Sequence, residues 1–323
     1  MKYRQTAALV ATILIAACGG GGGSGPGGVQ DPVAGLAIST GNAETVAKLS
    51  YEAALGSGEL ADLGGNLGMT ATSSGDFSKP SSGTQPAGFL VNVMQKIPFG
   101  PEVLPCAVSG FVTLSGNVAN PVTLTAGDNF LVESDACDDG LGEVVDGDLS
   151  FTVAEFSGDV LAGAYLVSMD AVVDNLQVTT AEDTVTGNGD TRISLDTRTA
   201  LFVTASVSGN SMTTDSNASS ETLTNYSSVQ TADVSATQPL YTHSASGTLQ
   251  TTRLSGSIRY STPLTFESVG QNYPHTGEML ISGESSSARL IAIDDVNVRI
   301  EVDNNGDGTV DDTIDTTWAE LTA

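Results

Sequence analysis

The sequence contains few basic residues, histidines and cysteines, and it has no apolar run of membrane-spanning length. Eleven Lys and Arg stand against 38 Asp and Glu, which gives a formal net charge of −27 over 323 residues. Binding to nucleic acids or anionic lipid surfaces needs basic patches, so the composition excludes a nucleic-acid partner. With only two His, and no His-Glu-x-x-His, Gly-x-Ser-x-Gly or phosphate-binding Gly-Lys motif, we predict that the chain is not an enzyme.

The first residues have the three parts of an export signal. Lys2 and Arg4 form a short basic segment, and Ala7–Ala17 is apolar and uncharged. This run is shorter than the roughly 20 residues that cross a bilayer, and it is typical of a signal-peptide core. Small residues, Ile15-Ala16-Ala17, stand directly before Cys18. A thiolate at that position is a good nucleophile for accepting an acyl group.

This start resembles the lipobox of bacterial lipoprotein precursors. The resemblance implies that residues 1–17 are removed as a signal peptide and that Cys18 becomes the acylated N-terminus. Residues 18–30, almost all Gly after the cysteine, then form a flexible tether. Gly19 in place of Asp implies the outer membrane, with the body facing the periplasm or the cell surface. The alternative is an ordinary secretory signal in which Cys18 is incidental.

Two cysteines are left once Cys18 is acylated. An even pair in an exported chain predicts a disulfide between Cys106 and Cys137. Such a bond closes a loop of about 30 residues and contributes roughly 3 kcal/mol in the chain-entropy description. The alternative is a metal-binding or catalytic thiol, which is disfavoured because no His lies near either Cys in the sequence.

Residues 31–323 form the predicted body, which begins with a helix at about 42–55. Thr40 or Asn42 can cap this helix, apolar residues recur near a 3.6-residue period, and Gly56 marks its end. Residues 64–88 are rich in Gly, Ser, Thr and Pro and are predicted to form a loop. No helical pattern follows residue 63.

From about residue 89, short runs alternate between apolar and polar residues, as strands with one buried face do. Asp146-Gly147, Asn188-Gly189 and Ser208-Gly209-Asn210 are predicted hairpin turns. The Ser/Thr-rich stretch 203–262 is either a linker or a set of solvated strands, and its turn spacing favours strands.

The sequence therefore predicts an all-β fold, an antiparallel meander that forms a curled sheet or barrel-like body with one short N-terminal helix. Two packed sheets, a β-sandwich, are the runner-up.

The strongest candidate binding motif is acidic and lies near the C-terminus. Residues 303–311 read Asp-Asn-Asn-Gly-Asp-Gly-Thr-Val-Asp and resemble the calcium loop of EF-hands. Ile314 replaces the usual bidentate Glu, and the flanks are strand-like, so the alternative is a polar hairpin turn. The implied ligands are Asp303, Asn305, Asp307, Thr309 through its carbonyl, and Asp311, with Asp312 and Asp315 as candidate replacements for the missing Glu.

Three functions are consistent with these features. The first is a lipid-anchored envelope lipoprotein with a structural or binding role and a protein, glycan or lipid partner. The second is a carrier that shelters a lipid or other apolar ligand in the curled sheet. A distant third is an unrecognised hydrolase that uses His243 or His275 with Ser and Asp.

Overall fold

The computed structural model describes residues 35–66, 101–119, 124–138, 140, 142–159, 162–181, 183–270 and 272–322, with side chains of the first segment described up to Gly56. Cys18, the Gly-rich tether and most of the predicted loop at 64–88 lie outside these residues. No helix in the described part of the chain is long and apolar enough to cross a membrane.

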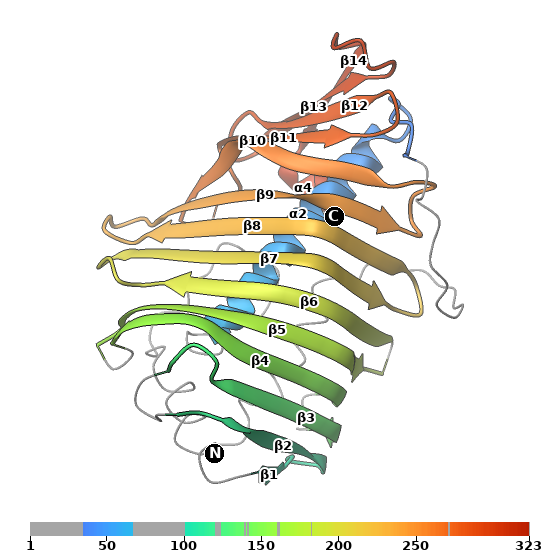
Figure 1. Cartoon of the computed structure of the whole chain (residues 1–323). Helices are drawn as coiled ribbons and strands as arrows, with labels where there is room; N and C mark the ends of the chain where they lie inside the picture. Colours follow the sequence, from blue (N-terminus) through green and yellow to red (C-terminus); the bar gives the residue numbers. More distant parts are fainter. Residues whose placement is uncertain are drawn as a thin grey trace.

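Fourteen antiparallel strands form one sheet in which every strand pairs with the next one along the chain (Figure 1). The prediction of an all-β antiparallel meander is confirmed, and in the part of the chain that the structure describes the single curled sheet is neither closed into a barrel nor packed as a sandwich. The strands are β1 (Glu102–Pro105), β2 (Ser109–Asn117), β3 (Asn129–Asp138), β4 (Val144–Asp159), β5 (Ala164–Thr179), β6 (Thr184–Asp196), β7 (Phe202–Asp215), β8 (Ser220–Asp233), β9 (Leu240–Thr251), β10 (Ile258–Val269), β11 (Thr276–Ser282), β12 (Ser287–Ala292), β13 (Asn297–Asp303) and β14 (Asp312–Thr317).

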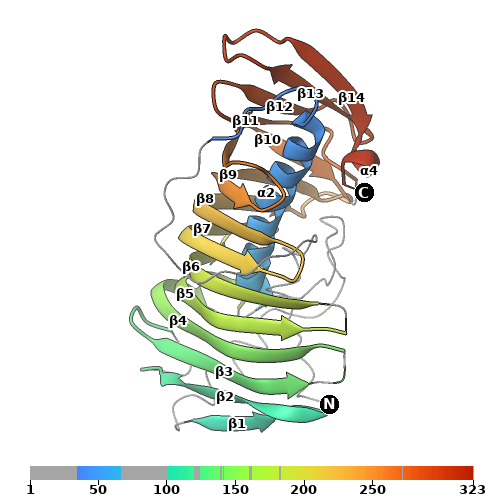
Figure 2. The same cartoon turned by 90° about the vertical axis from the view of Figure 1, so that its right-hand side faces the viewer.

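The N-terminal helix is longer than the predicted 42–55. Helix α2 (Ala43–Asn66) crosses one face of the sheet, and the strands curl around it (Figure 2). The predicted end at Gly56 is wrong, because the helix continues through this residue. A glycine inside a helix costs only about 1 kcal/mol, and packing against the sheet outweighs that cost. Side chains along the described part of the helix are buried, among them Val46, Ala47 and Ala54.

A second helix was not predicted. Helix α4 (Trp318–Leu321) follows β14, and Thr317 caps it in a reciprocal capping box with Glu320. A four-residue helix is too short to show a helical period in the sequence. Trp318 and Leu321 are buried within the sheet's inner face.

Two large apolar clusters cover the inner face of the sheet. The amino-terminal cluster is built mainly from β3 to β8 and includes Phe151, Tyr165, Met169 and Ile193. The carboxyl-terminal cluster joins β9 to β14 with α2 and α4. The described side chains of α2 belong to the carboxyl-terminal cluster, and none of them belongs to the amino-terminal one.

Three predicted hairpin turns are instead bends inside strands. Gly147 lies in β4, Gly189 in β6 and Gly209 in β7, and the ladder register shifts at Gly147 and just after Gly189. A Cβ at any of the three would come within 3.0 Å of the backbone of the adjacent strand. Glycines inside strands mark bulges and close backbone approach, and they curve a sheet. These residues therefore help to shape the curl and do not end strands.

The Ser/Thr-rich stretch 203–262 forms strands, as the sequence favoured, and belongs to β7, β8, β9 and β10. Hydroxyl groups pair across neighbouring strands on the outer face. The Oγ1 atoms of Thr213 and Thr222 are 3.2 Å apart, and those of Thr231 and Thr242 are 2.7 Å apart. Cross-strand hydroxyl pairs of this kind stabilise a solvated sheet face without large apolar residues.

The segment before α2 forms hydrogen bonds with the carboxyl-terminal part of the sheet. The Leu36 backbone N–H donates to the Ser257 carbonyl at 2.9 Å, and the Glu284 N–H donates to the Leu36 carbonyl at 2.8 Å. The Ile38 N–H donates to Ser286 Oγ at 2.7 Å. These bonds hold the start of α2 beside the turn that joins β11 to β12.

Candidate functional site

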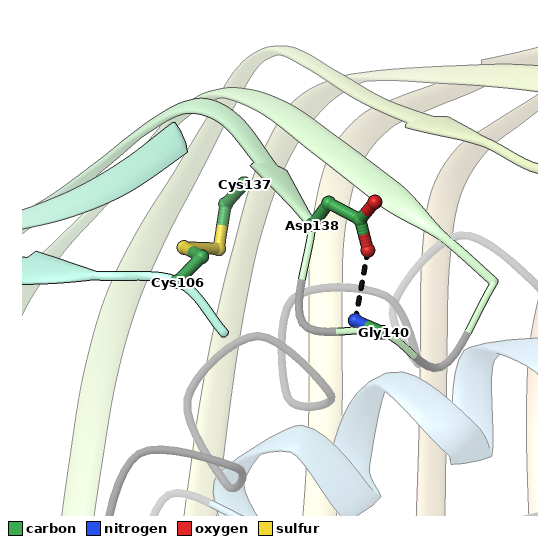
Figure 3. Close-up of a disulfide and its surroundings, with 4 residues drawn as sticks. All are labelled: Cys106, Cys137, Asp138 and Gly140. Carbon is green, nitrogen blue, oxygen red and sulfur yellow. Dashed lines mark hydrogen bonds between the residues drawn. A yellow bond between two sulfur atoms is a disulfide. The ribbon is translucent and has the colours of Figure 1, made fainter. Parts of the chain in front are cut away.

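The predicted cysteine pair is assembled at the first edge of the sheet (Figure 3). Cys106 follows β1 and Cys137 lies in β3, and their Cα atoms are 5.5 Å apart in a disulfide. Cys137 is fully buried beside Val112 of the intervening strand β2. Next to it, Asp138 Oδ1 accepts a hydrogen bond from the Gly140 N–H at 2.8 Å. The disulfide therefore links edge strand β1 to the inner strand β3.

The candidate calcium loop connects β13 to β14, and Asp303 organises its first half. The carboxylate of this buried residue accepts backbone N–H bonds from Asn305, Gly306 and Gly308 at 3.2, 2.7 and 2.9 Å. Burial opposes ionisation of Asp303, but these three donors outweigh it and hold the pKa below its usual value. Asp303 is thus an ionised carboxylate that closes the turn.

The second half of the loop repeats this pattern. Asp307 Oδ1 accepts from the Thr309 hydroxyl and, at 2.8 Å, from its N–H. These bonds lower the pKa of Asp307, with the hydroxyl bond as the largest cause. Asn305 Oδ1 accepts from the Asp307 N–H at 2.9 Å, and Asp311 Oδ2 accepts from the Asn304 N–H at 2.8 Å. All five first-choice ligand residues therefore lie in one hairpin loop.

The two replacement candidates point to other partners. Asp315 Oδ1 accepts from Arg299 Nε at 2.8 Å across β13 and β14, and Asp312 Oδ1 accepts from the Thr313 N–H at 2.8 Å. Among the described residues, no three His, Cys, Asp or Glu side chains form a group that could hold a metal ion. A cation at the loop would therefore depend on carbonyl and amide oxygens beside the carboxylates.

The loop also contacts the start of the body. Asn304 Oδ1 accepts from the Thr40 N–H at 3.1 Å, three residues before α2 begins. A Cβ at Gly306 would lie 3.0 Å from the backbone of Ser285 in the turn between β11 and β12. The shape of the loop is thus linked to the position of the segment that leads into the helix.

A buried histidine lies on the inner face under α2. His243 Nε2 of β9 is 3.1 Å from Ser228 Oγ of β8, and both side chains are buried. The ring also bonds to the backbone of Ala54 in α2. The histidine thus joins the sheet to the helix, with contacts to β8 and to α2.

We expect His243 to make the fold sensitive to moderate acid. Burial lowers the pKa of His243 from 6.5 to about 4, although the bond to Ala54 raises it in part. Between these values the unfolded chain binds a proton that the folded chain does not. The stability from neutral His243 is therefore complete above pH 6.5 and is lost as the pH falls to about 4, by on the order of 3 kcal/mol.

Thermal unfolding of the wild type and His243→Gln between pH 7 and 4 measures this effect. The wild-type melting temperature should fall more steeply than that of the variant. Carboxylates such as Asp303 and Asp307 titrate in both proteins, so they cancel in the difference between the two slopes. Parallel curves would show that His243 does not couple folding to pH.

Comparison of the chain with models of known families, with curated proteins and with solved structures finds no match.

Proposed function

We propose that the protein is a lipid-anchored lipoprotein of the outer membrane with a structural or binding role and no catalytic activity. The observation that carries this proposal is the position of Cys18, directly behind an uncharged apolar run and ahead of a Gly-rich segment. Multiple acyl chains on that residue give stable anchoring, and the Gly-rich segment lets the body stand away from the lipid.

The body supports a binding role through its width and its polar outer face. The outer face has hydroxyl pairs such as Ser227 with Ser246, 2.9 Å apart, and ion pairs such as Arg299 with Asp315. A broad sheet with polar side chains on its outer face can meet an envelope protein or a glycan without exposing its core. The buried Ser228–His243 pair lacks the solvent access that hydrolysis needs.

Replacing Cys18 with Ser tests the anchor. The wild type should partition with membranes and carry the mass of its acyl groups, whereas Cys18→Ser should be soluble after cell fractionation and lack that mass. Cys106→Ser combined with Cys137→Ser is the matched control, because it removes the disulfide and leaves Cys18 in place. A Cys18→Ser protein that stays in the membrane with the wild-type mass would exclude lipidation at this residue.

A second candidate function is the carriage of a lipid or other apolar ligand. The amino-terminal cluster favours it, since large apolar side chains such as Phe151, Met169 and Leu176 line the inner face of β4 and β5. A lipid or other apolar ligand would lie against these side chains.

We also propose that the loop at 303–311 binds Ca²⁺ weakly. The acidic residues of the hairpin repel one another, and a cation would offset that repulsion. At about ten times a millimolar dissociation constant, binding contributes about 1.4 kcal/mol and raises the melting temperature by roughly 3–6 °C.

Melting the whole chain in EDTA and in 10 mM Ca²⁺ checks the calcium proposal. Asp307→Asn should remove the calcium-dependent rise, whereas Asp294→Asn, in the turn between β12 and β13, should keep it. Identical melting of the wild type with and without calcium would leave the loop as a polar turn.

A further inference from the structure

The open sheet ends in two edge strands, β1 and β14 (Figure 1). An edge strand presents backbone N–H and C=O groups onto which a strand of another molecule can add. At β1, the Cys106 N–H donates to the Gly110 carbonyl of β2 at 3.1 Å, so alternation directs the N–H groups of positions 103 and 105 away from β2. Pro105 has no N–H, and Val103 is therefore the one residue of β1 with an outward donor.

Strand β14 is longer, and its outward donors follow from its pairing with β13. The Trp318 N–H donates to the Val296 carbonyl at 3.0 Å, in register with the pairing of the two strands. Hydrogen bonding alternates along an antiparallel strand, so the even-numbered residues of β14 direct their N–H groups to β13. The N–H groups of Thr313, Asp315 and Thr317 therefore point away from the sheet.

Carboxylates of the chain itself bind two of these three outward donors. The Thr313 N–H donates to Asp312 Oδ1 at 2.8 Å, and the Thr317 N–H donates to Glu320 Oε2 at 3.1 Å. The hydroxyl groups of Thr317 and Thr316 also donate to Glu320, and these bonds with the N–H bond lower its pKa. A hydrogen bond to a carboxylate is stronger than one to a neutral carbonyl, so an incoming strand competes poorly for these donors.

A second copy of the chain is the partner that this edge would meet by symmetry. In an antiparallel pair of two β14 strands, Thr313 would face Thr317 of the second copy, and Asp315 would face its own equivalent. That pairing needs all three outward N–H groups of each copy. The carboxylates hold two of the three, which leaves the pair with a minority of its hydrogen bonds.

We propose that Asp312 and Glu320 form an autoinhibitory contact, in which their oxygens occupy the outward N–H groups of β14 and keep two copies of the chain from pairing at this edge. The acceptor oxygens prevent the pairing, and the charges of the two side chains are secondary. For Glu320 this role is additional to its part in the capping box of α4.

Sedimentation velocity of the full chain tests the proposal. All proteins carry Cys18→Ser and are measured in EDTA, so that neither acyl groups nor bridging cations drive association. At about 100 µM, Asp312→Ala combined with Glu320→Ala should associate, with an average mass that rises toward twice that of the monomer. Asp312→Asn combined with Glu320→Gln is the matched control. It removes the same two charges, keeps an acceptor oxygen at each position and should stay monomeric like the protein with both carboxylates.

Adding Asp315→Pro to the alanine pair locates the association. Proline removes the middle outward N–H, and it is tolerated at an edge strand because that N–H makes no bond to β13. The triple variant should be monomeric again. Each of three results would overturn the proposal, namely a monomeric alanine pair, an Asn–Gln pair that associates equally, and association that persists with Asp315→Pro.

Amide hydrogen exchange of the protein with both carboxylates is a second measurement, which does not depend on how the alanine pair folds. The amides of Thr313 and Thr317 should have higher protection factors than the amide of Asp315, although all three point away from the sheet. Equal protection of the three amides would show that the carboxylates do not hold the outward donors, and this result would also overturn the proposal.

Discussion

Replacing Trp318 with Ala should strongly lower the free energy of unfolding, and by more than Tyr273→Ala does. The indole is fully buried and stacks on Tyr273, with 6.0 Å between the ring centroids. The ring centroids of Tyr51 and Phe266 lie 5.0 and 6.1 Å from that of Trp318. Its Nε1–H donates to the carbonyls of Pro274 and Asp294 at 3.0 and 3.2 Å. Truncating a buried Trp costs about 3–5 kcal/mol, or a fall in melting temperature on the order of 10 °C.

The measurement is thermal and urea unfolding followed by circular dichroism, because Trp318 is the only tryptophan and the variant has no indole fluorescence. Tyr273→Ala is the control, since Tyr273 stacks on the same ring but is 42% exposed. Tyr273→Ala should lower the free energy of unfolding by about 1 kcal/mol. A loss below 1 kcal/mol for Trp318→Ala would show that α4 does not close the carboxyl-terminal cluster.

Adding one methyl group at Gly209 should also have a large effect. A Cβ there would come within 3.0 Å of the Asp190 carbonyl in β6 and of the Tyr226 phenol in β8. Tyr226 is buried and donates to that same carbonyl at 2.9 Å. The methyl group must push apart neighbouring strands or break this bond, so we expect Gly209→Ala to cost about 3 kcal/mol or more.

Gly56→Ala is the matched control with the opposite sign. Gly56 lies inside α2, and a Cβ there would meet nothing within 4 Å. Alanine should therefore stabilise the helix by about 1 kcal/mol. Urea unfolding of both variants gives the two free energies. Equal and small effects from both substitutions would contradict the close approach of strands at Gly209.

The strands were predictable wherever burial follows the two-residue period without interruption. Val298, Ile300 and Val302 alternate with polar residues, and burial in β13 follows that pattern from Asn297 to Val302. The bends were not predictable, because Asn-Gly and Asp-Gly favour a positive φ in a hairpin turn and in a bulge alike. Which of the two forms at Gly189 depends on the strand pairing with β7.

The contact between Ser228 and His243 could not be predicted from the sequence for a related reason. Ser228 and His243 are 15 residues apart, and only the register of β8 against β9 brings them together. That register depends on an irregularity between Thr224 and Ser227, where Asn225 has a φ of +48°. One residue of slip would move either side chain to the opposite face of the sheet. By contrast, Cys106 and Cys137 were paired by counting alone.

The bonds from the first described segment to the last strands set an order of events during synthesis. Every described strand can pair with the preceding one as the chain emerges, since neighbours in the sheet are also neighbours in the sequence. Leu36 and Thr40, however, must wait for Ser257, Glu284 and Asn304. The first described segment is therefore locked in place only after the last strands have formed. The inner face of the growing sheet must therefore be kept from aggregating until almost the whole polypeptide has been synthesised.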